Sequence, residues 1–150
     1  MSQLRVLGIL TATAFAATLA MLALTPATAA AQASLAKRDR VVMQVSDNDP
    51  AKWNLALNNA ENLQEALGAK NIDIEIVAYG PGINMLKAES IVGNRVDDAM
   101  KAGVKMEACQ VTMRKAKLTK ADMLDKIGYV PGGVIEIMHR EQEGWAYIRP

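Results

Sequence analysis

The chain has 150 residues, of which 51% are hydrophobic and 22% are charged. This length fits one domain and excludes a large multidomain enzyme. Lys and Arg number 17 and Asp and Glu 16, so no excess of one charge points to nucleic acid or an acidic membrane surface. The single cysteine excludes an intramolecular disulfide framework and a Cys-x-x-Cys redox pair, and the single histidine excludes a His-rich metal centre.

Residues 1–33 have the pattern of a secretory signal peptide. A short basic start precedes residues 6–24, which are apolar or small and carry no charge. Two A-x-A patterns follow, ending at Ala29 and Ala33, and signal peptidases cut after such patterns. An uncleaved membrane anchor is the alternative, because the apolar stretch is long enough to span a bilayer. Pro26 and the small residues after it favour cleavage.

Cleavage near either alanine predicts a protein that is periplasmic or secreted and keeps no stable membrane anchor. Residues 34–40 are polar and basic, and they predict a short flexible lead-in. We expect the folded domain to span residues 41–150.

The domain alternates predicted strands and helices. Short apolar or alternating runs predict strands at 41–45, 71–79, 104–109, 127–130 and 145–148, and the first of them is rich in β-branched residues. Helical spacing and turn signals predict helices at 50–67, 88–102 and 131–141, with helical pieces at 111–116 and 119–125. Asp49 before Pro50 is a strong helix start, and Gly68 fits the position after the helix end. The alternation predicts an α/β fold with a parallel sheet covered on both faces.

Ligands of open parallel sheets bind beyond the carboxyl ends of the strands. Four segments of this chain reach that edge: 46–50, 80–83, 109–112 and 131–133. Three of them lead into helices, whose first backbone N–H groups are unpaired and carry partial positive charge. The edge is therefore where we expect a functional site.

Cys109 ends the third predicted strand, just before such a helical turn. A thiol in this position is expected to have a lowered pKa, and the nearby bases Arg114, Lys115, Lys117 and Lys120 favour the thiolate if they reach it. The alternative is that Cys109 is a small buried apolar residue, which is the commoner role of a lone cysteine. Its unpaired state in an exported protein and its place at a strand end favour a functional thiol.

The loops around Cys109 contain candidates for binding an anion or a substrate. A Gly-Pro-Gly turn can form an anion-binding nest of backbone N–H groups, although a tight turn that needs glycine explains it equally well. The same two explanations apply to the Pro-Gly-Gly segment. The candidate residues are Gly80, Gly82, Gln110, Thr112, Gly132 and Gly133.

Several segments resemble the DsrE/DsrF-like family, in particular its exported single-domain members. They are GVKMEACQVTMRKAKLTKADML (103–124), VPGGVIEIMHREQEGWAYIRP (130–150), VVMQVSDNDPAKWNLALNNAENL (41–63) and IEIVAYGPG (74–82). The resemblance covers residues 40–150, and its most specific parts are Ala-Cys at 108–109 and Gly-Trp-Ala-Tyr-Ile at 144–148. It implies a three-layer α/β/α sandwich on a five-stranded, mainly parallel sheet, often assembled as a trimer or hexamer.

The resemblance also implies a role in sulfur relay. Intracellular members carry sulfane sulfur as a persulfide on a cysteine whose position matches Cys109. Thiolate chemistry allows this without a second cysteine in the same chain. The expected partners are thiol or persulfide donors and acceptors, either proteins or small sulfur compounds, and we expect neither a metal nor an organic cofactor. Whether such a carrier is an enzyme in its own right stays open, because the sequence holds no self-contained catalytic constellation.

Two alternatives belong to other classes. A non-catalytic oligomeric binding module could keep the fold without the relay, and a buried, inert Cys109 would favour it. A periplasmic Cu(I)-binding protein could use the soft sulfur ligands of Met106, Cys109 and Met113. Against copper, Met106 lies in a strand position that we expect to be core.

Overall fold

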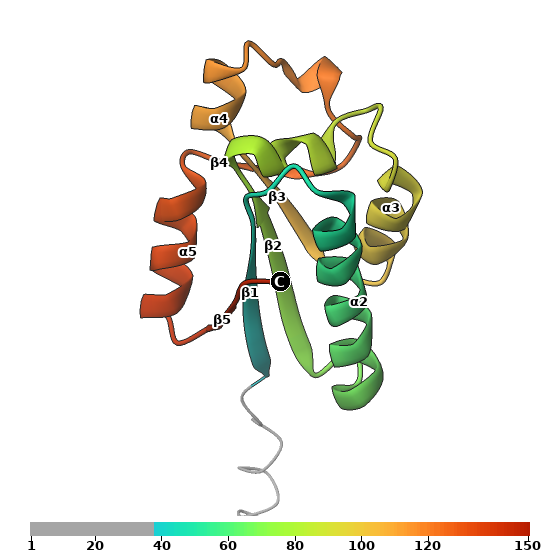
Figure 1. Cartoon of the computed structure of the whole chain (residues 1–150). Helices are drawn as coiled ribbons and strands as arrows, with labels where there is room; N and C mark the ends of the chain where they lie inside the picture. Colours follow the sequence, from blue (N-terminus) through green and yellow to red (C-terminus); the bar gives the residue numbers. More distant parts are fainter. Residues whose placement is uncertain (1–37) are drawn as a thin grey trace, which may run out of the picture. The chain divides into compact units, whose positions relative to one another are not determined.

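The computed structural model describes residues 38–150 (Figure 1). The N-terminal segment for which we predict a signal peptide lies outside these residues. The elements, in chain order, are β1 (Asp39–Val45), α2 (Pro50–Leu67), β2 (Ile72–Ala78), the 3₁₀ helix η1 (Gly80–Leu86), α3 (Gly93–Lys101), β3 (Lys105–Cys109), α4 (Gln110–Lys115), the 3₁₀ helix η2 (Lys120–Asp122), β4 (Gly128–Val130), α5 (Gly133–Gln142) and β5 (Ala146–Ile148).

The five strands form one sheet in the order β4-β3-β2-β1-β5. Every neighbouring pair is parallel, which confirms the predicted α/β class and makes the sheet wholly parallel. Parallel neighbours require crossover connections, and the helices between the strands supply them. All strands therefore end at the same edge of the sheet.

Two layers of helices sandwich the sheet (Figure 1). α2 and α3 cover one face and α5 covers the other, while α4 and η1 lie at the carboxyl edge of the strands. The face under α2 and α3 holds most of the core, including the fully buried Met43, Ile76 and Met106. Burying an aliphatic side chain of this size stabilises the fold by about 1.5–3 kcal/mol. The face under α5 has a smaller apolar cluster, in which Val42, Val77, Val130, Ile137 and Trp145 pack together.

Local signals set the start and end of α2 as predicted. The Asp49 side chain accepts a hydrogen bond from the N–H of Ala51 at 2.9 Å, and Pro50 occupies the first helical position. Gly68 follows the last turn with a φ of 85°, a conformation that favours glycine. A capping box of Thr119 and Asp122 starts the single 3₁₀ turn η2, which replaces the helical piece expected at 119–125.

Several element boundaries differ from the prediction, and contacts with distant residues explain two of them. β1 begins at Asp39, so the last two residues of the expected lead-in belong to the sheet; the N–H of Asp39 donates to the carbonyl of Asn71 at 3.0 Å. α3 begins at Gly93, five residues later than expected. The preceding segment is held by other contacts, since Lys87 forms an antiparallel bridge with Met123. Tertiary pairing overrides the helical pattern there.

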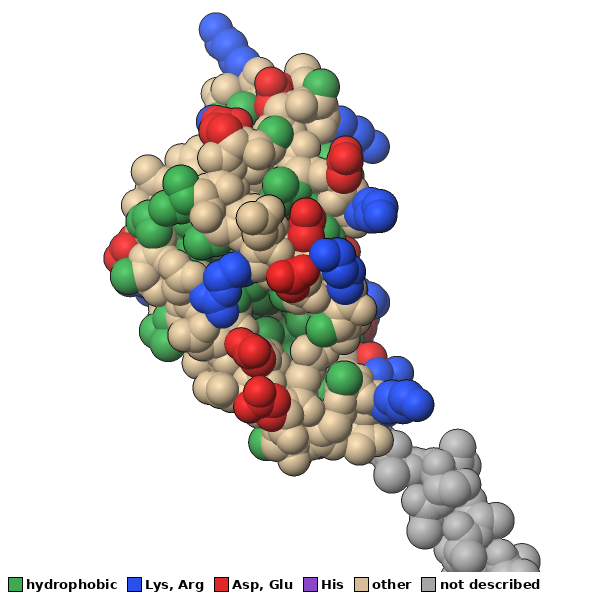
Figure 2. All heavy atoms as spheres, turned by 90° about the vertical axis from the view of Figure 1, so that its right-hand side faces the viewer, with side chains coloured by type: hydrophobic (Ala, Val, Ile, Leu, Met, Phe, Trp, Pro, Cys, Tyr) green, Lys and Arg blue, Asp and Glu red, His purple; other side chains and the backbone are tan. Residues whose placement is uncertain are grey.

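The surface over α2 and α3 mixes positive and negative side chains without a patch of one sign (Figure 2). This pattern agrees with the near-neutral composition of the whole chain. In the part of the chain that the structure describes, no helix combines the length and apolar character needed to cross a bilayer.

Candidate functional site around Cys109

Cys109 is the last residue of β3 and also the N-cap of α4. β3 lies between β2 and β4, so the strand carries the thiol to the carboxyl edge of the sheet. The residue is 4% exposed, yet it belongs to neither of the two apolar clusters. It is therefore covered by its neighbours, as a buried cysteine ordinarily is, and the groups that face its sulfur decide its chemistry.

Hydrogen-bond donors from two helices surround the sulfur. The N–H of Thr112 lies 3.4 Å from Sγ of Cys109. Burial raises the pKa of the thiol, but hydrogen bonds from the Thr112 hydroxyl and from the N–H groups of Gly133, Thr112 and Val111 outweigh it. The pKa of Cys109 consequently lies below its ordinary value, as expected, because donors that face a sulfur atom stabilise its anion.

The Thr112 hydroxyl connects the sulfur to the loop after β2. Its oxygen accepts a hydrogen bond from the N–H of Gly80 at 2.9 Å, which leaves the hydroxyl proton free to face Sγ of Cys109. Gly80 has a φ of 52°, a conformation that favours glycine. The structure thus brings Gly80, Thr112 and Cys109 together, with Gly80 acting through Thr112.

Gly133 is held close to the sulfur by its packing. It is the first residue of α5, and Gly132 is the N-cap. A Cβ on Gly133 would lie 2.9 Å from Cβ and 3.0 Å from Cδ1 of Tyr79, so a side chain here would overlap the tyrosine. The close approach lets the start of α5 reach the end of β3. A Cβ on Gly132 would meet only the flexible end of the Ile135 side chain, at 3.2 Å.

Gly82 and Gln110, two further candidates for binding an anion or a substrate, do not face the sulfur in any contact that the structure describes. A Cβ on Gly82 would overlap the backbone at the end of β1. The N–H of Gly82 donates hydrogen bonds to the carbonyls of Ser46 and Tyr79. The N–H of Gly80 likewise donates to the Thr112 hydroxyl. In this conformation both glycine N–H groups of the Gly-Pro-Gly turn are therefore paired within the protein, and neither faces an anion. Gln110 lines a shallow cleft of about 220 Å³ beside α4, whose lining does not include Cys109.

The bases after Cys109 contribute less than expected. Arg114, Lys115, Lys117 and Lys120 are all exposed to solvent. Backbone N–H groups and one hydroxyl supply the stabilisation of the thiolate. The arrangement is that of a covered thiol whose anion is stabilised by neutral donors.

The methionines considered as copper ligands lie in the core. Met106 and Met113 are 2% and 6% exposed and pack in the larger cluster, under α2 and α3. Cys109 belongs to the other face, because successive residues of a strand alternate sides. Across the described residues 38–150, no group of three or more His, Cys, Asp and Glu side chains could hold a metal ion.

A large groove lies away from the thiol. It has a volume of about 800 Å³ and is lined at the amino ends of β3 and β4, where Lys101, Lys105 and Lys126 alternate with Asp97 and Asp125. Ligands of parallel sheets bind at the opposite edge. The groove is therefore at the edge of the sheet opposite to Cys109.

The model of the DsrE/DsrF-like family matches residues 39–150, which is the entire folded domain. The chain belongs to the DsrE/DsrF-like family. This confirms the predicted resemblance and the fold that it implies, and it places the chain in a family related to sulfur relay. No curated protein matches the chain at the threshold applied.

Two solved structures resemble this DsrE/DsrF-like domain. MTH1491 from Methanobacterium thermoautotrophicum is 36% identical, with a TM-score of 0.71 over 75% of this chain and 99% of its own. BT1422 from Bacteroides thetaiotaomicron is 15% identical, with a TM-score of 0.62 over 75% of this chain and 95% of its own, and shows the shared fold alone. Both are described as proteins of unknown function.

Sequence reasoning missed the polar residues on the α5 face of this DsrE/DsrF-like domain. Glu75 on β2 is fully buried, and Arg140 of α5 is its ion-pair partner at 2.9 Å. A signal was present in the alternation of isoleucines with acids over 72–76, which marks a strand with one apolar and one polar face. The position of the arginine relative to the strand required the tertiary structure.

Proposed function

We propose that this protein is an exported sulfur carrier that holds sulfane sulfur as a persulfide on Cys109. The observation that supports the proposal most directly is the ring of donors around Sγ, in which Thr112 and Gly133 belong to different helices. Such donors stabilise a thiolate, and a persulfide is a sulfur anion of the same kind. Membership of the DsrE/DsrF-like family supports the same role.

The transfer needs no oxidant or reductant. The Cys109 thiolate attacks the outer sulfur of a donor persulfide, R–S–SH; a new S–S bond forms, the donor S–S bond breaks, and R–S⁻ leaves. An acceptor thiolate then attacks the outer sulfur on Cys109 and releases the Cys109 thiolate. The covering of the sulfur limits unwanted exchange with bulk thiols, because exchange rates depend on access.

Mass spectrometry of the intact protein tests this function. The mature protein is incubated with a small persulfide donor and compared with Cys109→Ser. We expect a gain of one sulfur atom in the wild type, none in the variant, and loss of the added sulfur to an acceptor thiol. Absence of uptake by a folded wild type, with a thiol that reacts only after unfolding, would overturn the proposal.

That second outcome would favour a non-catalytic binding module, and the 4% exposure of Cys109 is the observation in its favour. The two functions differ in the reactivity of the native thiol. Alkylation of the folded protein across pH separates them, since a carrier reacts at a pH below the ordinary cysteine pKa and a purely structural thiol stays protected.

Export and assembly are further parts of the proposal. The apolar run over 6–24 and the A-x-A patterns after it support cleavage near Ala29 or Ala33. N-terminal sequencing of protein from the cell envelope would identify the cut. Exposed apolar side chains on α5, namely Val134, Ile135 and Met138, support a homo-oligomer, which native mass measurement would detect as a trimer or hexamer.

A further inference from the structure

We propose that Glu75 and Arg140 are positioning residues for Cys109: their ion pair fixes α5 on the sheet, and α5 carries the Gly133 N–H to the sulfur. The inference rests on the proposed function in taking Cys109 as the reactive thiol. It assigns a role to a buried charge that the transfer chemistry itself does not use.

Glu75 is the one polar or charged side chain that is buried among the described residues. It lies on β2 with 0% exposure, and neither carboxylate oxygen has a well-aligned hydrogen-bond donor. Its ion-pair partner is Nη2 of Arg140, 2.9 Å from Oε2. Burial raises the pKa of Glu75, and the guanidinium of Arg140 opposes that rise. A buried carboxylate with one cationic partner holds that partner firmly, because separating the pair leaves a charge unpaired away from water.

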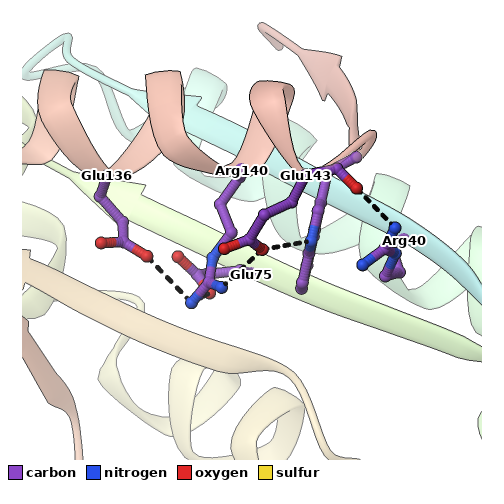
Figure 3. A network of polar contacts seen from close by, with 6 residues as sticks. Arg40, Glu75, Glu136, Arg140 and Glu143 are labelled. Carbon is purple, nitrogen blue, oxygen red and sulfur yellow. Dashed lines mark hydrogen bonds and ion pairs between the residues drawn. The ribbon is translucent and has the colours of Figure 1, made fainter.

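Arg140 ties the C-terminal half of α5 to the sheet (Figure 3). It also pairs with Glu136 at 2.9 Å and with Glu143 at 3.2 Å, and its guanidinium lies 4.9 Å from the ring centroid of Trp145. Arg40 of β1 approaches the same ring and donates to the carbonyl of Glu143 at 2.6 Å. Side chains from β1, β2 and α5 thus converge on this end of the helix.

The N-terminal half of α5 has no comparable polar anchor. Gly132 provides no side-chain cap, and Val134 and Ile135 are 63% and 54% exposed. Gly133 and Ile137 are the buried residues of the helix. Gly133 and Arg140 are separated by about 10 Å along the axis, at 1.5 Å per residue. Because a helix of two to three turns moves as a rigid rod, a shift at Arg140 displaces the Gly133 N–H from Cys109.

Whether Cys109 reacts faster or slower when the charge of Glu75 is removed separates this positioning role from a direct electrostatic effect. Glu75 pairs with Lys105, four residues before Cys109, so the two groups are roughly 13 Å apart at 3.3 Å per residue. Removal of a distant negative charge stabilises a thiolate and would speed its reaction. Loosening of α5 removes an N–H donor and would slow it. The two mechanisms therefore predict opposite changes.

The test is the pH profile of Cys109 alkylation in folded Glu75→Gln, with no sulfur donor present. Tyr79 lies near Cys109, and burial raises its pKa. Its hydroxyl therefore stays neutral from pH 5 to 9, and its ionisation does not enter the alkylation profile. We expect the pH midpoint of alkylation, which reports the thiol pKa independently of access to the sulfur, to rise by about 0.5 to 1 pH unit. The rate at pH 7, taken relative to the plateau at high pH, should then fall by about threefold to tenfold, since a tenfold change in thiolate corresponds to one pKa unit. The amide resonance of Gly133 should shift in the same variant.

Glu107→Gln is the matched control. Glu107 lies on β3, on the same face and closer to the thiol, and its carboxylate makes no ion pair within the described residues. The control should react at the wild-type rate or faster. Arg140→Gln should reproduce the slowing if Glu75→Gln folds poorly, and Arg140→Lys, which keeps a cation, should partly restore the rate.

The outcomes distinguish this inference from the proposed function. A wild-type rate or a faster one in both Glu75→Gln and Arg140→Gln, with an unmoved Gly133 resonance, would overturn the positioning role while leaving the carrier intact. Slowed alkylation together with no sulfur uptake by the wild type would support the positioning role and overturn the carrier. Circular dichroism and thermal unfolding confirm that each variant is folded.

Discussion

A methyl group on Gly133 is the sharpest perturbation of the donor ring around Cys109. In Gly133→Ala the new Cβ would lie 2.9 Å from Cβ, 3.0 Å from Cδ1 and 3.2 Å from Cγ of Tyr79, so the start of α5 must move away from the ring. Overpacking of a buried contact costs about 1–3 kcal/mol. Alanine regains up to about 1 kcal/mol of helix propensity, which leaves a net loss of roughly 0–2 kcal/mol in the free energy of unfolding.

The effect on the thiol is expected to be larger than the effect on stability. Movement of α5 weakens the Gly133 N–H contact with Sγ of Cys109, one of the contacts that lower its pKa. A hydrogen bond to a charged group contributes about 1.5–3 kcal/mol, so its loss slows alkylation at pH 7 by about tenfold or more. The rate is measured with iodoacetamide from pH 5 to 9, and stability by urea unfolding.

Gly132→Ala is the control, because its Cβ meets only the flexible Ile135 side chain and the backbone there is extended, with a φ of −151°. It should cost only the small difference between glycine and alanine at a helix N-cap and leave the alkylation profile unchanged. The reasoning would be refuted if Gly133→Ala folded normally and reacted with the wild-type pH profile. Equal slowing in both variants would also refute it, since the effect would then not depend on the contact with Tyr79.

Three further predictions concern the neighbouring residues. Thr112→Val removes the hydroxyl that faces Cys109 and leaves the N–H of Gly80 without its acceptor; alkylation should slow, and calorimetry should show a loss of about 1–2 kcal/mol, which Thr112→Ser should not show. Burial raises the pKa of Glu107, so its ionised form penalises the folded state above the ordinary glutamate pKa. Glu107→Gln should therefore raise the free energy of unfolding by up to about 1 kcal/mol at pH 7, and a gain that persists at pH 3 would contradict this cause. Gly82→Ala places a Cβ against the backbone at the end of β1 and should destabilise by more than 2 kcal/mol, visible as a lower Tm; an unchanged Tm would show that this backbone yields easily.

Much of the fold follows from the local sequence. The Asp49–Pro50 start and the Gly68 end of α2 were predicted because caps and turn residues act over a few positions. Short apolar or alternating runs located all five strands, and their alternation with helices specified a parallel sheet. Errors occurred where distant contacts decide, as at the start of α3, where the bridge of Lys87 with Met123 and the hydrogen bond from the N–H of Ala88 to the carbonyl of Asp122 hold the segment before Gly93 outside the helix.

In the site around Cys109, too, some features follow from the local sequence and others from contacts between distant elements. The sequence by itself determined that Cys109 ends a strand at the carboxyl edge, since that follows from the order of strand and helix along the chain. Only the tertiary structure decided which donors surround the sulfur, because Gly133 and Thr112 come from separate crossovers. It also decided that Glu75 meets Arg140, a pairing across 65 positions that arises because α5 packs over β2. Local patterns encode the elements, whereas contacts between elements depend on how the whole sheet and its helices pack.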